Sequence, residues 1–257
     1  MLDVHPPHER VHGWRDFMVH LSTITIGLLI ALALEGVVEW IHHRNEVSET
    51  REALHRELDN NRNRFTSDVG FSRKEAAMLA NDLLVLEYVR DHPGSAPGTL
   101  PGVLVMNSSY MRMDDVAWKT AQATSVTPLM PQEEVRRAAE LYSFFDRIDK
   151  AHEDEADAMA EAVSLISEDP NPLHLRPAQI EKELDSIRAV FAKHLRHGFL
   201  MQNLAEEYPD FRPAPTRDEL EHWMHTPGAM DTADLRHAQE MTQQRMDADV
   251  KRNETGK

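Results

Sequence analysis

Apolar residues recur at intervals of three and four positions along most of the chain. After residue 41 there is no Gly or Pro until Gly70, and then none until Pro93. Asn61 and Ser72 are polar residues within this repeat. A repeat of this kind places one apolar stripe on a helix, so residues 42–91 are predicted to form a long amphipathic helix with a coiled-coil-like seam, with a break possible near Gly70. The stripe comprises Leu54, Leu58, Phe65, Val69, Ala76, Leu79, Leu83 and Leu86.

Two further long helices are predicted over residues 131–168 and 177–208. Pro131 suits a first helical position, and the intervening "SEDPNPLHLRP" interrupts the pattern. The first of these helices has the seam Val135, Ala138, Tyr142, Phe145, Asp149, His152, Ala156, Met159, Val163 and Ile166. The second has the seam Ile180, Leu184, Ile187, Phe191, His194, Gly198, Met201, Ala205 and Tyr208.

The segments between these helices are shorter or more polar. Residues 92–113 contain three Pro and three Gly and are predicted to form a loop, and a short helix is expected from residue 114 to about residue 125. A further short helix is expected in "RDELEHWMH", and the tail from Asp231 is highly polar. We therefore expect a helical bundle over residues 114–208 and a polar C-terminal segment over residues 209–257.

The segment over residues 17–41 is the most apolar of the chain, and its ionisable residues are His20, Glu35 and Glu39. As a helix it is roughly 37 Å long at 1.5 Å per residue, enough to cross a bilayer. Trp14 and Trp40 lie at its two ends, where indole rings favour the membrane interface. We favour a retained transmembrane helix preceded by an N-terminal tail, residues 1–16. A cleaved signal peptide and a core helix of a soluble protein are the alternatives.

Glu35 and Glu39 are one helical turn apart at the C-terminal end of this apolar segment. They are interpreted as ionisable residues at the membrane edge, where the hydrocarbon boundary lies near Leu34. The alternative is an ionisable site within an oligomeric membrane core. The predicted fold is accordingly all-α: a transmembrane helix that continues into a long amphipathic helix, with an antiparallel helical bundle.

Composition narrows the functional classes. The 257 residues have a formal net charge of −16 and include no Cys. Nucleic-acid binding requires clustered Lys and Arg, so no nucleic-acid partner is expected. The absence of Cys excludes disulfides, thiolate metal sites and Cys nucleophiles. Sequence motifs for nucleotide binding, serine hydrolases and zinc peptidases are also absent.

Two segments carry a resemblance to a known group of proteins. "TITIGLLIALALEGVVEW" followed by "REALHRELDNNRNRF", and later "AWKTAQATSVTPLMPQEEVRRAAELY", are similar to segments of bacterial single-pass membrane proteins of unknown function. The similarity covers residues 17–65 and 117–145. It implies an anchored helical domain and brings no assigned activity.

Seam histidines are the main candidates for chemistry. If residues 131–168 and 177–208 pair antiparallel around a turn near residue 173, His152 faces His194 and Asp149 faces His197. Asp149, His152, His194 and His197 could then bind zinc or another divalent ion, or form a proton-sensitive layer. The alternative is a hydrogen-bonded polar layer that sets the register of the helices. We expect no bound metal or other cofactor.

Other histidines form weaker patterns. The pairs Glu52/His55 and Glu219/His222 match the Glu-x-x-His spacing of di-iron bundles. His5, His8 and His12 lie close together in the N-terminal tail and could bind a metal. Chance matches to these patterns are expected in a chain with 15 His.

The sequence favours a non-enzymatic protein with a binding, sensory or scaffolding role, anchored in the bacterial inner membrane with most of the chain outside the cytoplasm. The alternative is a metal-dependent enzyme with a site in the bundle core. The expected partners are the lipid bilayer and either a second copy of the chain or another helical protein, because the seam begins close to the bilayer.

Overall fold

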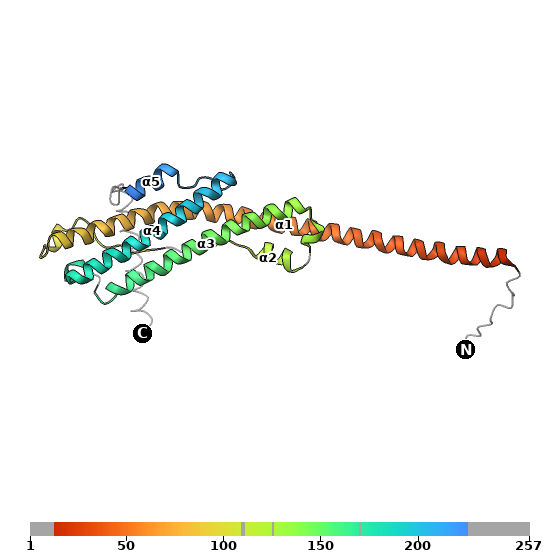
Figure 1. Cartoon of the computed structure of the whole chain (residues 1–257), viewed down its shortest axis with the longest axis horizontal. Coiled ribbons are helices and arrows are strands. Elements are labelled where there is room, and N and C mark those ends of the chain that lie inside the picture. Colours follow the sequence, from red (N-terminus) through yellow and green to blue (C-terminus); the bar gives the residue numbers. More distant parts are fainter. Residues whose placement is uncertain (1–12, 109–110, 125, 170, 226–257) are drawn as a thin grey trace, which may run out of the picture.

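The computed structural model describes residues 13–108, 111–124, 126–169 and 171–225. This part of the chain is helical, with short 3-10 turns and no strand (Figure 1). The all-α prediction is therefore confirmed. In chain order the α-helices are α1 (Trp14–Asp91), α2 (Val116–Ala123), α3 (Gln132–Ile166), α4 (Pro177–Glu207) and α5 (Arg217–His225), and the 3-10 turns are η1 (Pro97–Thr99), η2 (Thr127–Leu129) and η3 (Pro172–His174).

Helix α1 runs for 78 residues and passes through Gly70 without a break. Its N-terminal part extends alone from the bundle, and Val47 is its first buried residue (Figure 1). Side chains of the apolar segment are exposed, with Ile24 at 70 % and Leu32 at 55 %. The helix is long and apolar enough to cross a membrane, and its most apolar stretch is not buried in the bundle, unlike a core helix of a soluble protein. Trp14 and Trp40 are also exposed.

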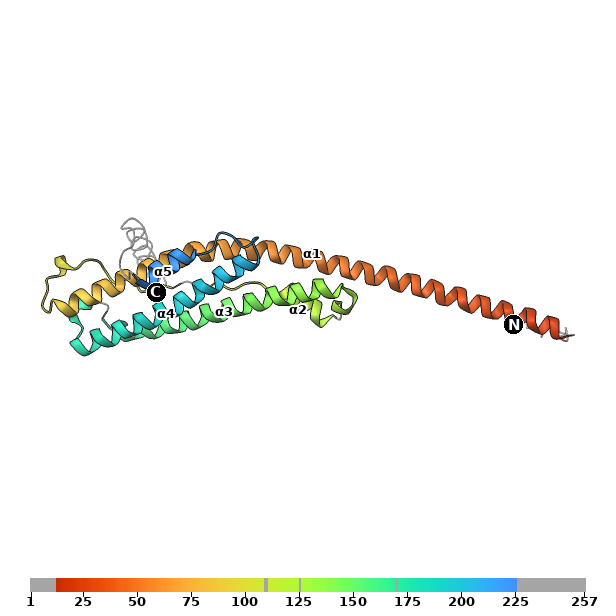
Figure 2. The ribbon, with the colours of Figure 1, turned by 45° about the horizontal axis from the view of Figure 1, so that its top comes forward.

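Helices α3 and α4 form an antiparallel hairpin that packs along the C-terminal half of α1 (Figure 2). The apolar interior has two parts. One surrounds Phe65 and Phe145, on the side of the free N-terminal half of α1, and the other surrounds Leu79 and Ile187 at the far end. The helix contacts thus bear out the predicted bundle, which also includes the C-terminal part of α1.

Polar side chains interrupt the stripe of α1 at seven-residue intervals. Asn61, Asp68, Glu75 and Asp82 are each buried. Two of them bind the segment that connects α1 to α2. Asn61 exchanges hydrogen bonds with the backbone of Asp114, at 2.8 and 2.7 Å. The carboxylate of Asp82 accepts from the backbone N–H groups of Val105 and Met106, at 2.7 and 2.9 Å. The predicted loop is thereby fixed along α1.

Glu57 ties α2 and α3 to α1. Its carboxylate accepts hydrogen bonds from the N–H of Ala117 at 2.6 Å and from the hydroxyl of Tyr142 at 2.6 Å. The first N–H groups of a helix have no partner within the helix, so Glu57 satisfies a donor of α2 that would otherwise be unpaired. Trp118, in the same turn of α2, stacks on Tyr142 with ring centroids 5.5 Å apart.

The bundle extends past residue 208, where the predicted polar C-terminal segment begins. Phe211, Leu220 and Trp223 are buried. Helix α5 approaches α4 closely at Gly198, where an added Cβ would lie 2.6 Å from Cδ2 of Leu220. Glycine at position 198 therefore allows α5 to pack this closely against α4. The polar tail from Asp231 lies outside the described residues.

The seam predicted for α3 is wrong at three positions. Asp149, Ala156 and Val163 were expected to face the core, whereas Ile148, Glu155 and Ala162 are the buried residues. An alternation of four- and three-residue steps that starts from the buried Leu141 passes through Phe145 and selects these last three. The predicted seam alternated just as regularly, but it reached Phe145 from Tyr142, which is also buried. Its next step was therefore the four-residue one to Asp149, on the neighbouring face. The seam predicted for α4 is buried from Ile180 to Ala205.

We predict that Glu57→Ala destabilises the protein by about 2–4 kcal/mol, because it leaves buried donors of α2 and Tyr142 unpaired. Urea unfolding of the full chain in detergent, followed by Trp fluorescence, measures the change. Glu52→Ala is the matched control, since Glu52 is exposed on the same helix. The control should change the free energy of unfolding by less than about 0.5 kcal/mol. Equal effects of the two variants would contradict the role of Glu57.

A second prediction concerns the pH dependence of stability through Glu183. This residue is buried on α4, and neither of its carboxylate oxygens has a hydrogen-bond partner among the described residues. Burial and the nearby Asp82 raise the pKa of Glu183 to about 7. The folded state therefore keeps a proton that the unfolded state releases near pH 4.5, so this group lowers the stability of the fold as the pH rises from about 4.5 to 7.

Glu183→Gln removes this titration, so the variant should gain stability relative to the natural protein as the pH rises. The expected gain is about 1.4 kcal/mol per pH unit across the window, up to about 3 kcal/mol above pH 7. Urea unfolding at pH 5 and pH 8 measures it. Glu181→Gln, at an exposed position of α4, is the control. A difference between Glu183→Gln and the natural protein that stays constant with pH would contradict the prediction.

Candidate functional site

Six ionisable side chains meet between the two apolar parts of the core. Three helices contribute two each, and every one of the six is at most 2 % exposed. In α1 the pair is seven residues apart, and in α3 and α4 the members of each pair are three residues apart, so each pair projects from one face of its helix. The six are Asp68 and Glu75 from α1, His152 and Glu155 from α3, and His194 and His197 from α4.

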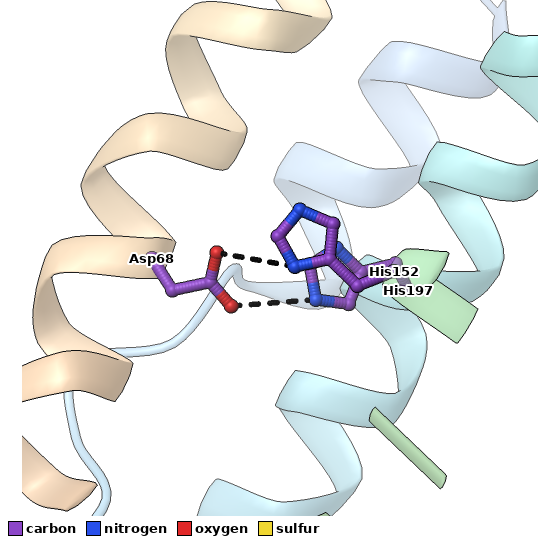
Figure 3. Close-up of side chains that lie close together, drawn as sticks. All are labelled: Asp68, His152 and His197. Atoms are coloured by element: carbon purple, nitrogen blue, oxygen red, sulfur yellow. Dashed lines mark ion pairs between the residues drawn. The ribbon is translucent and has the colours of Figure 1, made fainter. Parts of the chain in front are cut away.

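Asp68 faces two stacked imidazole rings (Figure 3). Its Oδ1 lies 3.8 Å from Nδ1 of His152, and its Oδ2 lies 3.4 Å from Nε2 of His197. The two rings are 4.5 Å apart between centroids, with 25° between their planes. Both oxygens of one carboxylate are thus directed at nitrogens from two other helices.

Glu155 links the remaining histidine to this group. His194 donates from Nδ1 to Oε1 of Glu155 at 2.6 Å, and its Nε2 lies 3.3 Å from the hydroxyl of Ser72. The other oxygen of Glu155, Oε2, lies 3.4 Å from Nδ1 of His197. A continuous series of polar contacts therefore leads from Ser72 through His194, Glu155 and His197 to Asp68.

The electrostatics of the cluster favour a charged centre. Burial alone would raise the pKa of Glu155, but His194 and His197 outweigh it and lower the pKa to about 2. Burial alone would lower the pKa of His197, and the carboxylates of Asp68 and Glu155 instead raise it to about 9. The pKa of Glu75 is raised well above its usual value by burial and by the charges of Glu155 and Asp68.

Three of the four predicted site residues are in this cluster, and Asp149 is not. Asp149 accepts a hydrogen bond from the N–H of Met113 at 3.1 Å and lies 3.7 Å from Nε of Arg112, so it holds the segment before α2. The predicted register is also wrong. His152 stacks on His197 rather than facing His194, and Glu155 takes the place opposite His194. The pairing is displaced along α4 by three residues, almost one turn.

Asp68, Glu75 and Glu155 were not predicted as site residues. A signal for the first two was present, because they continue the seven-residue series of Asn61, whose polar position within the seam was recognised. No comparable signal marked Glu155, because a regular seam through Tyr142 and Phe145 selects Ala156 instead. Acidic residues are usually assigned to the solvent-exposed face of a helix, so these three positions were not considered as core residues.

The other candidate residues do not join the cluster. Glu52 and His55 are exposed, and Glu219 is bound by Arg73 at 2.8 Å. Neither Glu-x-x-His pair therefore contributes to the buried centre. Glu35 and Glu39 lie exposed on the free part of α1. The tail histidines His5, His8 and His12 lie outside the described residues.

Imidazole and carboxylate groups are the ligands that divalent transition metals accept from proteins lacking cysteine. Two triads have ligand atoms within 4.8 Å of one another: Asp68, His152 and His197 in one, and Glu75, Glu155 and His194 in the other. Because all six side chains are buried, the arrangement suits the binding of an ion or a proton better than the turnover of a substrate.

No protein-family model, curated protein or solved structure matches the chain.

Proposed function

We propose that this chain is a non-enzymatic, membrane-anchored binding or sensory protein whose bundle core is coupled to the membrane through α1. The observation that carries the proposal is the continuity of this helix. The same unbroken helix contains the exposed apolar segment and also contributes Asp68 and Glu75 to the buried cluster. The resemblance to bacterial single-pass membrane proteins supports the same interpretation.

The coupling follows from how the core is packed. Asp68 contacts residues of both α3 and α4, so a change in the contacts of the cluster alters the fit of α1 against the hairpin. Packed interiors respond to such changes by moving whole elements rather than by deforming locally. A displacement of α1 in the bundle would also move the apolar segment, because the helix is continuous. In the membrane, that segment could contact a membrane partner or a second copy of the chain.

The alternative, a metal-dependent enzyme in the bundle core, has less support. An enzyme active site needs a concave opening through which the substrate reaches the reacting groups. The six clustered side chains are closed off from solvent, with His194 and Glu155 at 0 % exposure. A buried cluster of this kind favours a small bound ion or a proton over an organic substrate.

Membrane anchoring is tested by placing charge in the apolar segment. Leu28→Arg combined with Leu32→Arg should release the protein from membranes, since each Arg costs about 2.5–3.5 kcal/mol near the centre of a spanning helix. The measurement is the fraction of protein that stays with membranes after alkaline carbonate extraction. Leu84→Arg is the control, because Leu84 is an exposed residue of the same helix within the bundle. Retention of the double variant in the carbonate-resistant fraction would contradict the anchor.

Orientation is tested with single cysteines, because the chain contains none. We expect Glu52→Cys, at an exposed position just beyond the apolar segment, to react with a membrane-impermeant maleimide in intact spheroplasts. This outcome places the bundle outside the cytoplasm. Detergent-lysed cells supply the control for full reactivity. Labelling that occurs only after lysis would reverse the proposed orientation.

A further inference from the structure

The contacts of Asp68 with the two stacked histidines are too long for hydrogen bonds between charged groups. Such bonds are about 2.7–2.9 Å long, whereas the separations here are 3.4 and 3.8 Å. Within the described part of the chain, Oδ2 of Asp68 and Nε2 of His197 have no hydrogen-bond partner. Buried polar groups are almost always satisfied, so these two atoms require another explanation.

A metal ion between the carboxylate and the imidazoles accounts for the spacing. Zinc binds nitrogen and oxygen ligands at about 2.0–2.2 Å, and the corners of a tetrahedron of that size are about 3.3–3.6 Å apart. The separation of 3.4 Å between Asp68 and His197 matches that distance. The ligand atoms of Asp68, His152 and His197 all lie within 4.8 Å of one another, so small movements of the side chains would place all three around one ion.

The surroundings of His197 also fit a metal ligand. Metal-bound histidines usually donate their second ring N–H to a carboxylate, which orients the ring. His197 directs Nε2 at Asp68 and Nδ1 at Oε2 of Glu155, 3.4 Å away. Glu155 is in turn held by His194 at 2.6 Å. The chain thus places a carboxylate beside the second ring nitrogen of His197. At 3.4 Å this oxygen has no hydrogen-bond partner in the described residues, and a small movement of the ring would bring the two into hydrogen-bond distance.

Buried carboxylates need a compensating cation, and in the described ranges histidines, rather than Lys or Arg, lie beside Asp68 and Glu155. The Arg and Lys residues found in ion pairs bind more exposed carboxylates, as Arg73 does with Glu219. A divalent cation would balance the two negative charges in place of the protons that the histidines otherwise hold, because a histidine binds a metal in its neutral form.

We propose that Asp68, His152 and His197 bind one divalent first-row transition-metal ion, with Glu155 and His194 as positioning residues. The site differs from the one predicted from sequence by containing Asp68 in place of Asp149. This inference rests on the proposed function, because it names a metal ion as the ligand that the proposed binding protein binds. Its tests use metal content and affinity, so it can fail while membrane anchoring stands, and the reverse also holds.

The test uses the full chain purified in detergent, stripped with a chelator and then equilibrated with zinc. We expect one zinc ion per chain by elemental analysis after removal of free metal, and a higher Tm than for the stripped protein. Replacing zinc by cobalt should give visible absorption bands of a low-symmetry site with nitrogen and oxygen ligands. Both measurements use the natural sequence, so they do not depend on whether a variant folds.

Variants then assign the ligands. Asp68→Asn and His197→Ala should abolish stoichiometric zinc binding. Glu155→Gln should weaken it by about 10–100-fold and retain the stoichiometry, as expected for a residue that orients a ligand. Asp82→Asn is the matched control, because Asp82 is an equally buried carboxylate of α1 bound to backbone N–H groups. Replacing His5, His8 and His12 together by Ala controls for binding by the tail, and both controls should keep one zinc.

Each outcome decides the question. A folded natural chain that binds no stoichiometric zinc, or that binds it without any rise in Tm, overturns the proposal and makes the cluster a polar layer that sets helix register. Loss of zinc in the tail variant, with retention in Asp68→Asn, assigns the metal to the tail and overturns it equally. Loss in Asp68→Asn and His197→Ala alone, with the helical content unchanged by circular dichroism, supports it.

Discussion

The fold depends on one constraint, which is that α1 directs a polar side chain into the bundle every seventh residue from Asn61 to Asp82. A buried polar group without a partner costs more than a hydrogen bond contributes, so each of these positions must be matched by another part of the chain. Asn61 and Asp82 bind the backbone of the long connection, and Asp68 contacts α3 and α4. The path of the connection and the placement of the hairpin are both consequences of this series.

The same series divides the interior into three zones. An apolar part that includes Phe65 lies on one side and another that includes Leu79 on the other, with the ionisable cluster between them. The apolar parts supply most of the folding free energy, since burial of such side chains contributes about 1.5–3 kcal/mol each. The cluster contributes less to stability, because the attraction between buried charges does little more than offset the free energy needed to remove those charges from water. A group of this composition in this position is better explained by specificity or by binding.

The sequence was sufficient for the architecture and only partly sufficient for the cluster. Apolar periodicity is a local property, so the positions of α3, α4 and α5 were predicted to within about two residues. Relative register is not local. A difference of three residues in the pairing of α3 and α4 exchanged the partner of His152 from His194 to His197. The contribution of α1 was missed because a carboxylate is exceptional within an apolar seam. That Asp68 faces two histidines becomes visible only once the three helices are placed side by side in space.

The unbroken course of α1 sets a length scale for the molecule. A helix rises 1.5 Å per residue, so the end of α1 at Asp91 lies about 75 Å along the axis from Ile41, and Asp68 lies about 40 Å from it. If the apolar segment crosses a bilayer, the cluster stands well clear of the lipid head groups, in the aqueous compartment. The length of α1 then sets the height above the bilayer at which the tip of the bundle can meet a partner. Inserting or deleting residues in the helix would shift that height by 1.5 Å per residue.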